Sequence, residues 1–194
     1  MIDCQPWRWN WFRRRVAVLA APGSPAALPA KAATTVIPIV FMIGSDPVEL
    51  GLVASLNRPG GNLTGVAYLN VEVAPKRLEL LHEFVPTAKS IALLVNPANP
   101  VTAAAQVKEL QAAVPTLGVH LLLVNASNPI EIEDAFATLV RDRVEALQIG
   151  VDPLFGNHSD QIVALATRQQ DADDLSVARI YGGRRSHELR IEHP

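Results

Sequence analysis

A small polar residue followed by proline recurs along this chain of 194 residues. The pairs are Ser24-Pro25, Asp46-Pro47, Asn96-Pro97, Asn99-Pro100 and Asp152-Pro153. Serine, aspartate and asparagine are favoured helix N-caps, and proline suits the first helical position because its φ is already set and it carries no N–H. Each pair therefore predicts the capped start of a helix. For any one of them, capping alone is a sufficient role.

The segments that precede and follow these pairs alternate between two patterns. Short runs rich in Val, Ile and Leu lie at 16–20, 37–42, 91–95, 119–124 and 146–151. Runs that are apolar throughout are typical of buried parallel strands. The stretches 76–85, 102–117 and 131–141 instead repeat apolar residues at helical spacing, which gives each of them one buried face. This alternation predicts an α/β fold of right-handed βαβ units, with parallel sheets flanked by helices.

Taken together, the polar residues at the predicted strand exits indicate a binding site. Ligands of open parallel sheets bind beyond the carboxyl ends of the strands. Helix N-termini at this edge present free N–H groups and the positive end of a dipole, which suits a carboxylate. Four such exits carry hydroxyl, carboxylate or amide groups, so the sequence predicts a cleft for a small molecule.

Composition and motifs exclude several other kinds of protein. With 49% hydrophobic and 19% charged residues the chain can bury a sizeable core, and a net charge of −2 offers no bulk attraction for nucleic acid. The single cysteine, Cys4, provides neither a disulfide framework nor a cysteine metal site. No phosphate-binding loop, nucleophile elbow or histidine cluster at metal-ligand spacing is present. We therefore expect no catalytic residues, metal or cofactor, and an α/β hydrolase or transferase is disfavoured.

Several segments resemble one family closely. They are Ile37-Pro38-Ile39-Val40-Phe41, Gly44-Ser45-Asp46-Pro47-Val48, the run Asn57-Arg58-Pro59-Gly60-Gly61-Asn62-Leu63-Thr64-Gly65-Val66, Lys76-Arg77-Leu78-Glu79-Leu80-Leu81, and Leu94-Val95-Asn96-Pro97. The chain is similar over these stretches to the ABC-transporter substrate-binding proteins of the tryptophan/tyrosine type. The likeness extends from about Arg13 to Gln169, and the run from Asn57 to Val66 is its most specific part.

This resemblance implies a type I periplasmic binding fold, in which two Rossmann-like lobes close on a small ligand. Residues 13–70 would form the end of the first, incomplete lobe, and residues 71–170 most of the second. The family's cleft is lined by strand-exit loops, and the matching positions here are Ser24, Ser45, Asp46, Asn96, Asn99 and Asp152. By analogy, Asp46 or Asp152 would face the cation of an amino-acid-like ligand.

The resemblance also implies an ABC permease as the membrane partner and a periplasmic location for intact relatives. No signal peptide is recognisable in this chain. A ligand-sensing regulatory domain of the same fold remains an alternative, although no DNA-binding module is visible. A non-functional gene fragment is a second alternative.

Both ends, residues 1–12 and 171–194, depart from the family. Tryptophan has a single codon, and shifting the frame by one base across the Trp-Arg-Trp-Asn-Trp segment at 7–11 allows the family-like Leu-Ala-Val-Glu-Leu. A one-base shift of the reading frame across the tail, with a permitted choice of codons, also gives a family-like sequence. We therefore expect frameshifts near Phe12 and near Gln169. A first lobe without its central strands should leave sheet edges and apolar faces exposed.

Overall fold

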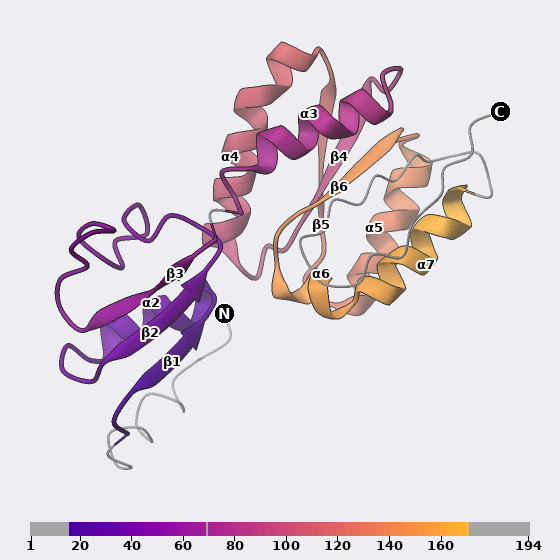
Figure 1. Ribbon diagram of the computed structural model, residues 1–194. Coiled ribbons are helices and arrows are strands. Elements are labelled where there is room, and N and C mark those ends of the chain that lie inside the picture. Colours follow the sequence, from indigo (N-terminus) through magenta and orange to yellow (C-terminus); the bar gives the residue numbers. More distant parts are fainter. Residues whose placement is uncertain (1–15, 69, 171–194) are drawn as a thin grey trace.

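The computed structural model describes residues 16–68 and 70–170. The two end segments 1–12 and 171–194 lie outside the described residues. Figure 1 shows two separate parallel sheets, one formed by the first three strands with α2 and the other by the last three strands with α3 to α7. The predicted α/β architecture, with parallel sheets flanked by helices, is confirmed.

The first sheet has the strand order β1-β2-β3, and all three strands are parallel. Its strands are β1 (Leu19–Pro22), β2 (Ile39–Ile43) and β3 (Leu63–Ala67). Successive side chains of a strand point to opposite faces. Ile39, Phe41 and Ile43 of the central strand are therefore buried together, and helix α2 (Ser24–Ala33) packs over them with Ala27 and Ala30.

The opposite face of the first sheet is exposed among the described residues. Val40 and Met42 of β2 are 45% and 47% exposed, and Val66 of β3 is 57% exposed. Parallel sheets normally have both faces covered. This apolar face agrees with the expectation of an incomplete first lobe.

The connection from β2 to β3 contains no helix, which corrects the helix expected at Asp46-Pro47. The Leu50 N–H donates to the Asp46 carbonyl oxygen at 3.1 Å, so a single turn does form. Gly51 then adopts a φ of 63°, a left-handed conformation that ends helices, and the next two residues enter the core. A cap and a proline can start one turn, but they cannot extend it past this glycine.

Two further capping predictions are wrong. The N-cap of α2 is Gly23, and Ser24 is the first residue of the helix. Asn96 begins a turn instead of a helix, because its side-chain oxygen accepts from the Ala98 N–H at 2.9 Å. The predictions at Asn99 and Asp152 are confirmed, since each is the N-cap of a helix whose first residue is proline.

The second sheet has the order β5-β4-β6 and is also parallel. Its strands are β4 (Ser90–Val95), β5 (His120–Asn125) and β6 (Ala146–Ile149). Helices α3 (Ala74–Phe84) and α4 (Pro100–Leu117) pack on one face, and α5 (Pro129–Arg141), α6 (Pro153–Asn157) and α7 (Ser159–Gln170) pack on the other. The central strand β4 is accordingly buried from Ile91 to Val95. No helix of the described residues has the length and apolar character needed to cross a membrane.

The predicted strands and helices are present, with shifted ends. Strand β1 begins at Leu19 instead of 16, because the Leu19 N–H donates to the Pro38 carbonyl oxygen and sets the pairing with β2. Helices α3, α4 and α5 each begin two residues before the predicted start. In α4 and α5 the two added residues are proline and an exposed apolar residue, Val101 or Ile130, so they do not belong to the buried face from which the pattern is counted.

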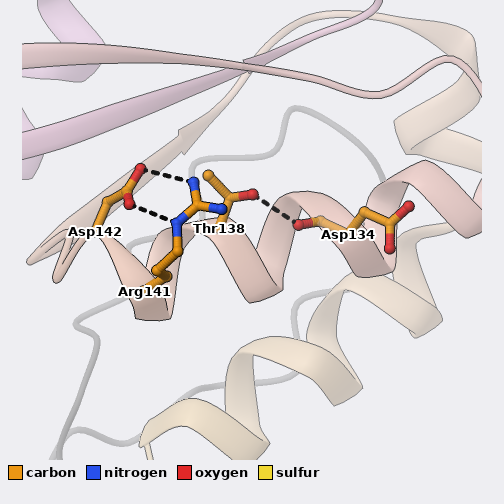
Figure 2. A network of polar contacts seen from close by, with 4 residues as sticks. All are labelled: Asp134, Thr138, Arg141 and Asp142. Carbon is orange, nitrogen blue, oxygen red and sulfur yellow. Dashed lines mark hydrogen bonds and ion pairs between the residues drawn. The ribbon is translucent and has the colours of Figure 1, made fainter.

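Helix α5 has an N-cap that the sequence pattern did not single out, although Asn128-Pro129 obeys the same rule as the other pairs. The Asn128 side chain accepts from the Glu131 N–H at 3.0 Å. The Glu131 carboxylate in turn accepts from the Ser127 hydroxyl at 2.6 Å and the Ser127 N–H at 2.7 Å. This reciprocal arrangement is a variant of the capping box, in which the Glu131 carboxylate bonds the N–H of the residue before the N-cap. At the other end of the helix Arg141 pairs with Asp142, and the Thr138 hydroxyl donates to the Asp134 carbonyl oxygen (Figure 2).

The capping box predicts an acid-dependent part of the stability. The hydrogen bond from the Ser127 hydroxyl, followed by that from the Ser127 N–H, lowers the pKa of Glu131 from its ordinary 4.5. A carboxyl whose folded pKa is depressed stabilises the fold above its unfolded pKa and loses this contribution as the pH falls through the folded pKa. Glu131→Gln should therefore flatten the fall of the melting temperature below pH 4.5. Melting curves across this range test the prediction.

The matched control is Glu133→Gln, which removes an exposed carboxylate of the same helix that accepts from Gln161 and makes no bond to Ser127 or Asn128. A Glu131→Gln variant whose melting temperature falls with acid as steeply as that of the wild type would contradict the role of the capping box.

Candidate functional site

Three of the six predicted site residues form one hydrogen-bonded cluster at the exits of β4 and β6. The Asn96 side-chain amide donates to Asp152 Oδ1 at 2.9 Å, and the Asn99 side-chain amide donates to Asp152 Oδ2 at 3.1 Å. Asn99 and Asp152 are buried, and Asn96 is half-buried. The cluster joins positions more than fifty residues apart, because β4 and β6 are neighbours in the sheet and Leu94 lies opposite Ile149.

The helices that begin at this edge hold the cluster in place. Asp152 Oδ1 also accepts from the Leu154 N–H at 2.9 Å, which caps α6. Asn99 occupies the N-cap position of α4, but its side chain makes no capping hydrogen bond because its amide is directed to Asp152. The helix start therefore fixes the backbone of Asn99, while the neighbouring strand exit fixes its side chain.

Gln106 of α4 supports the exit of β6, and sequence reasoning missed it. Its side-chain oxygen accepts from the Val151 N–H at 2.5 Å, and its side-chain nitrogen donates to the Val151 carbonyl oxygen at 3.3 Å. Gly150 permits this approach, since a Cβ at that position would lie 3.0 Å from the Gln106 oxygen. Gln106 is 3% exposed and is four residues from both Thr102 and Leu110, which are also buried. A polar residue on a buried helical face was the available signal.

The other three predicted site residues lie at the exits of β1 and β2. Asp46 is half-buried, and its Oδ1 accepts from the Val48 N–H at 2.6 Å and the Glu49 N–H at 3.3 Å. Ser45 is 5% exposed, and its hydroxyl has no hydrogen-bond partner among the described residues. Ser24 follows Gly23, whose N–H donates to the Met42 carbonyl oxygen at 2.8 Å. Ser24 is thereby placed at the exit next to that of β2, and it makes no hydrogen bond to the other five residues.

The exits of the two sheets meet at Gly44 and Val151. A Cβ added to Gly44 would lie 3.8 Å from Val151 Cγ1 and 3.6 Å from Asn70 Cβ. Gly44 immediately precedes Ser45 and Asp46, and Val151 immediately precedes Asp152. The structure therefore brings the backbone that directly precedes polar residues of both sheets together, at a junction between the two parts of the fold.

The segment that crosses between the two sheets is bonded on both sides of this junction. The Val71 N–H donates to the Gly44 carbonyl oxygen at 3.2 Å. From the second part of the fold, Arg77 of α3 donates to the Asn70 carbonyl oxygen at 3.1 Å, and Gln148 of β6 donates to the Ala74 carbonyl oxygen at 3.3 Å. The peptide units between Val71 and Ala74 thus connect residues anchored to different sheets.

The two aspartates at the strand exits have no cationic side-chain partner within the described residues. Ion pairs within the described residues join Lys76 to Glu79 and Arg141 to Asp142, so neither Asp46 nor Asp152 is paired with a cationic side chain there. The described residues contain no group of three or more His, Cys, Asp and Glu that could hold a metal ion. The polar residues at the strand exits are hydroxyl, amide and carboxylate groups, which can donate and accept hydrogen bonds.

Comparison with known proteins agrees with a role in binding a small molecule. The family model of the ABC transporter substrate binding proteins matches residues 10–170. A tyrosine-binding protein of Clostridioides difficile is 33% identical over 138 residues, which cover 71% of this chain and 39% of that protein. The family consists of solute-binding proteins, so the expectation of a binding protein instead of an enzyme is confirmed.

Solved structures with low sequence identity share the fold. A conserved domain protein from Vibrio cholerae superposes with a TM-score of 0.74 at 24% identity and covers 88% of this chain. An ABC domain in complex with L-Trp, from Streptococcus pneumonia, has a TM-score of 0.68 at 23% identity and covers 84% of this chain. The chain spans 55% of the length of each of these two structures.

Proposed function

The chain belongs to the family of ABC transporter substrate-binding proteins, and from this membership we propose that it binds a small amino-acid-like ligand between the exits of its two sheets. The approach of Gly44 to Val151 carries the proposal. In this proposal Ser45 and Asp46, which follow Gly44, contact the ligand from one side, and the cluster of Asn96, Asn99 and Asp152, which follows Val151 and β4, contacts it from the other. A ligand held there would contact both parts of the fold at once, as closure of two lobes on a ligand requires.

The ligand class follows from the groups at the junction and from the relatives. Carboxylates that have no cationic partner within residues 16–68 and 70–170 suit an ammonium group, and amides and hydroxyls suit a carboxylate or hydroxyl group of the ligand. One relative is named as tyrosine-binding, and one structure of the same fold contains L-Trp. L-tyrosine and L-tryptophan are therefore the first ligands to test.

The wider role follows from the family. Substrate-binding proteins of ABC transporters work with a transporter, so the partner proposed for the intact protein is an ABC permease in the membrane. The corresponding location is the extracytoplasmic side of that membrane, the periplasm in a cell with two membranes. The bound amino acid would be passed to the permease when the two lobes open.

Calorimetric titration with L-tyrosine and L-tryptophan tests the proposal directly. We expect saturable binding of at least one of them, and Ser45→Ala and Asn99→Ala should each weaken it by about tenfold. This factor corresponds to a lost hydrogen bond of about 1.5 kcal/mol at most, with 1.4 kcal/mol per factor of ten. One variant comes from each sheet, so both should lose affinity if the ligand bridges them.

Asn57→Ala is the matched control, since Asn57 is exposed in the loop that leads to the amino end of β3, away from the strand exits. The proposal fails if the wild-type protein shows no heat of binding with either amino acid. It also fails if both site variants bind as tightly as the control.

A further inference from the structure

The carboxylate of Asp152 is occupied by groups of the protein itself. Its Oδ1 accepts from the Asn96 amide and the Leu154 N–H, both at 2.9 Å, and its Oδ2 accepts from the Asn99 amide at 3.1 Å. Asp152 is also buried, at 8% exposure. Three donors on two oxygens, in a buried position, leave this side chain little capacity to turn toward a bound molecule.

The carboxylate of Asp46, by contrast, has one oxygen without a hydrogen-bond partner among the described residues. Its Oδ1 accepts from the N–H groups of Val48 and Glu49, which fix the orientation of the side chain. Its Oδ2 accepts no hydrogen bond from the described residues, and the side chain is only half-buried. Asp46 is therefore a pre-oriented carboxylate with one oxygen available.

The surroundings of Asp46 favour a donor that comes from outside the protein. The neighbouring Ser45 hydroxyl is buried and also lacks a partner among the described residues. The residue before it, Gly44, lies against Val151 at the junction of the two sheets. Buried polar groups are nearly always hydrogen-bonded, so the Ser45 hydroxyl needs a partner, and a ligand that also reaches the free oxygen of the half-buried Asp46 would supply one.

We infer that the two carboxylates have different roles: Asp46 holds the protonated amino group of the ligand, and Asp152 is a positioning residue that orients the amides of Asn96 and Asn99. This assignment rests on the proposed function and chooses between the two aspartates that sequence resemblance left open. It also predicts that the ligand must carry a cationic amine. The second sheet contributes neutral groups to the contact, because the negative charge of Asp152 faces Asn96, Asn99 and the α6 N-terminus.

Removing the amine from the ligand separates the two roles. The probes are L-tyrosine and 3-(4-hydroxyphenyl)propanoate, which differ only in the amino group. A hydrogen bond to a charged group is worth about 1.5–3 kcal/mol, so the wild-type protein should bind L-tyrosine about 10- to 150-fold more tightly than the deaminated probe. Asp46→Asn should reduce this ratio to nearly one, mainly by weakening the binding of L-tyrosine.

Asp152→Asn should give a different pattern. Loosening of Asn96 and Asn99 affects both probes, so both dissociation constants should rise by a similar factor while their ratio stays at the wild-type value. A purely structural defect moves affinity without changing the ratio, and the ratio therefore reports recognition of the amine alone. The control is Glu49→Gln, an exposed acidic neighbour in the same turn, which should leave both constants unchanged.

The outcomes distinguish this inference from the function on which it rests. If the wild-type protein binds L-tyrosine but Asp46→Asn retains the full ratio, or Asp152→Asn abolishes it, the division of roles is wrong and the binding function stands. If the wild-type protein binds neither L-tyrosine nor L-tryptophan, both the inference and the proposed function are overturned.

Discussion

Replacing Gly65 with alanine is expected to destabilise the first sheet by about 3 kcal/mol, the upper part of the usual range for overpacking. Gly65 lies opposite Phe41 in the pairing of β2 with β3. A Cβ at this position would collide with the Phe41 carbonyl oxygen and lie 2.6 Å from two carbons of the Phe41 ring. The backbone oxygen cannot move aside as a side chain can, so the ladder itself must shift.

Hydrogen exchange of the amides of β1, β2 and β3, followed by mass spectrometry, measures this loss within the first sheet. Gly44→Ala is the matched control, because its Cβ would meet only ordinary contacts at 3.6 Å or more and its φ lies outside the left-handed region. Protection of the first sheet in Gly65→Ala equal to that in Gly44→Ala would show that β3 accommodates a side chain here. The specific Thr-Gly-Val motif would then need another explanation.

Gln106→Leu is expected to destabilise the second part of the fold by about 2–6 kcal/mol, from two groups left unpaired at about 1–3 kcal/mol each. Leucine fills a similar volume but leaves the Val151 N–H and carbonyl oxygen without the side-chain partners that now satisfy both. Because Asp152 follows Val151 directly, the exit of β6 should also shift, and the affinity for L-tyrosine should fall along with the stability.

Urea denaturation of the Gln106→Leu variant measures its loss of stability. Calorimetric titration of the same variant with L-tyrosine measures its loss of affinity. The control is Gln111→Leu, the same substitution at an exposed position of α4, which should change the free energy of unfolding by no more than about 0.5 kcal/mol. If Gln106→Leu unfolds at the same urea concentration as this control, the hydrogen bonds to Val151 do not hold the strand exit.

Much of the fold followed from local sequence patterns. Continuous apolar runs identified every strand of the described residues except β3, because a central parallel strand such as β4 is buried on both faces. Helical spacing identified α3, α4 and α5, and an N-cap followed by proline located the starts of α4 and α6. These signals are carried by residues within one or two turns of each other, so a single sequence is enough to detect them.

The same rules failed where a distant or following residue decided the outcome. Asp46 does begin a turn, but Gly51 ends it before a helix can form. The rule itself holds at Asn128-Pro129, where Asn128 caps the helix and Glu131 completes the arrangement. The glycine at position 65 was visible in the motif, but only its register with Phe41 shows what its missing side chain avoids.

The sequence by itself determined that this is a parallel α/β protein with polar residues at its strand exits, because periodicity, capping and strand composition are local properties. Only the tertiary structure decided which of those residues meet. Asn96, Asn99 and Asp152 come together because β6 pairs with β4, and Gly44 meets Val151 because the crossing segment brings one sheet edge to the other. Those contacts depend on strand order and on the path between the sheets, and these arise when the whole chain packs.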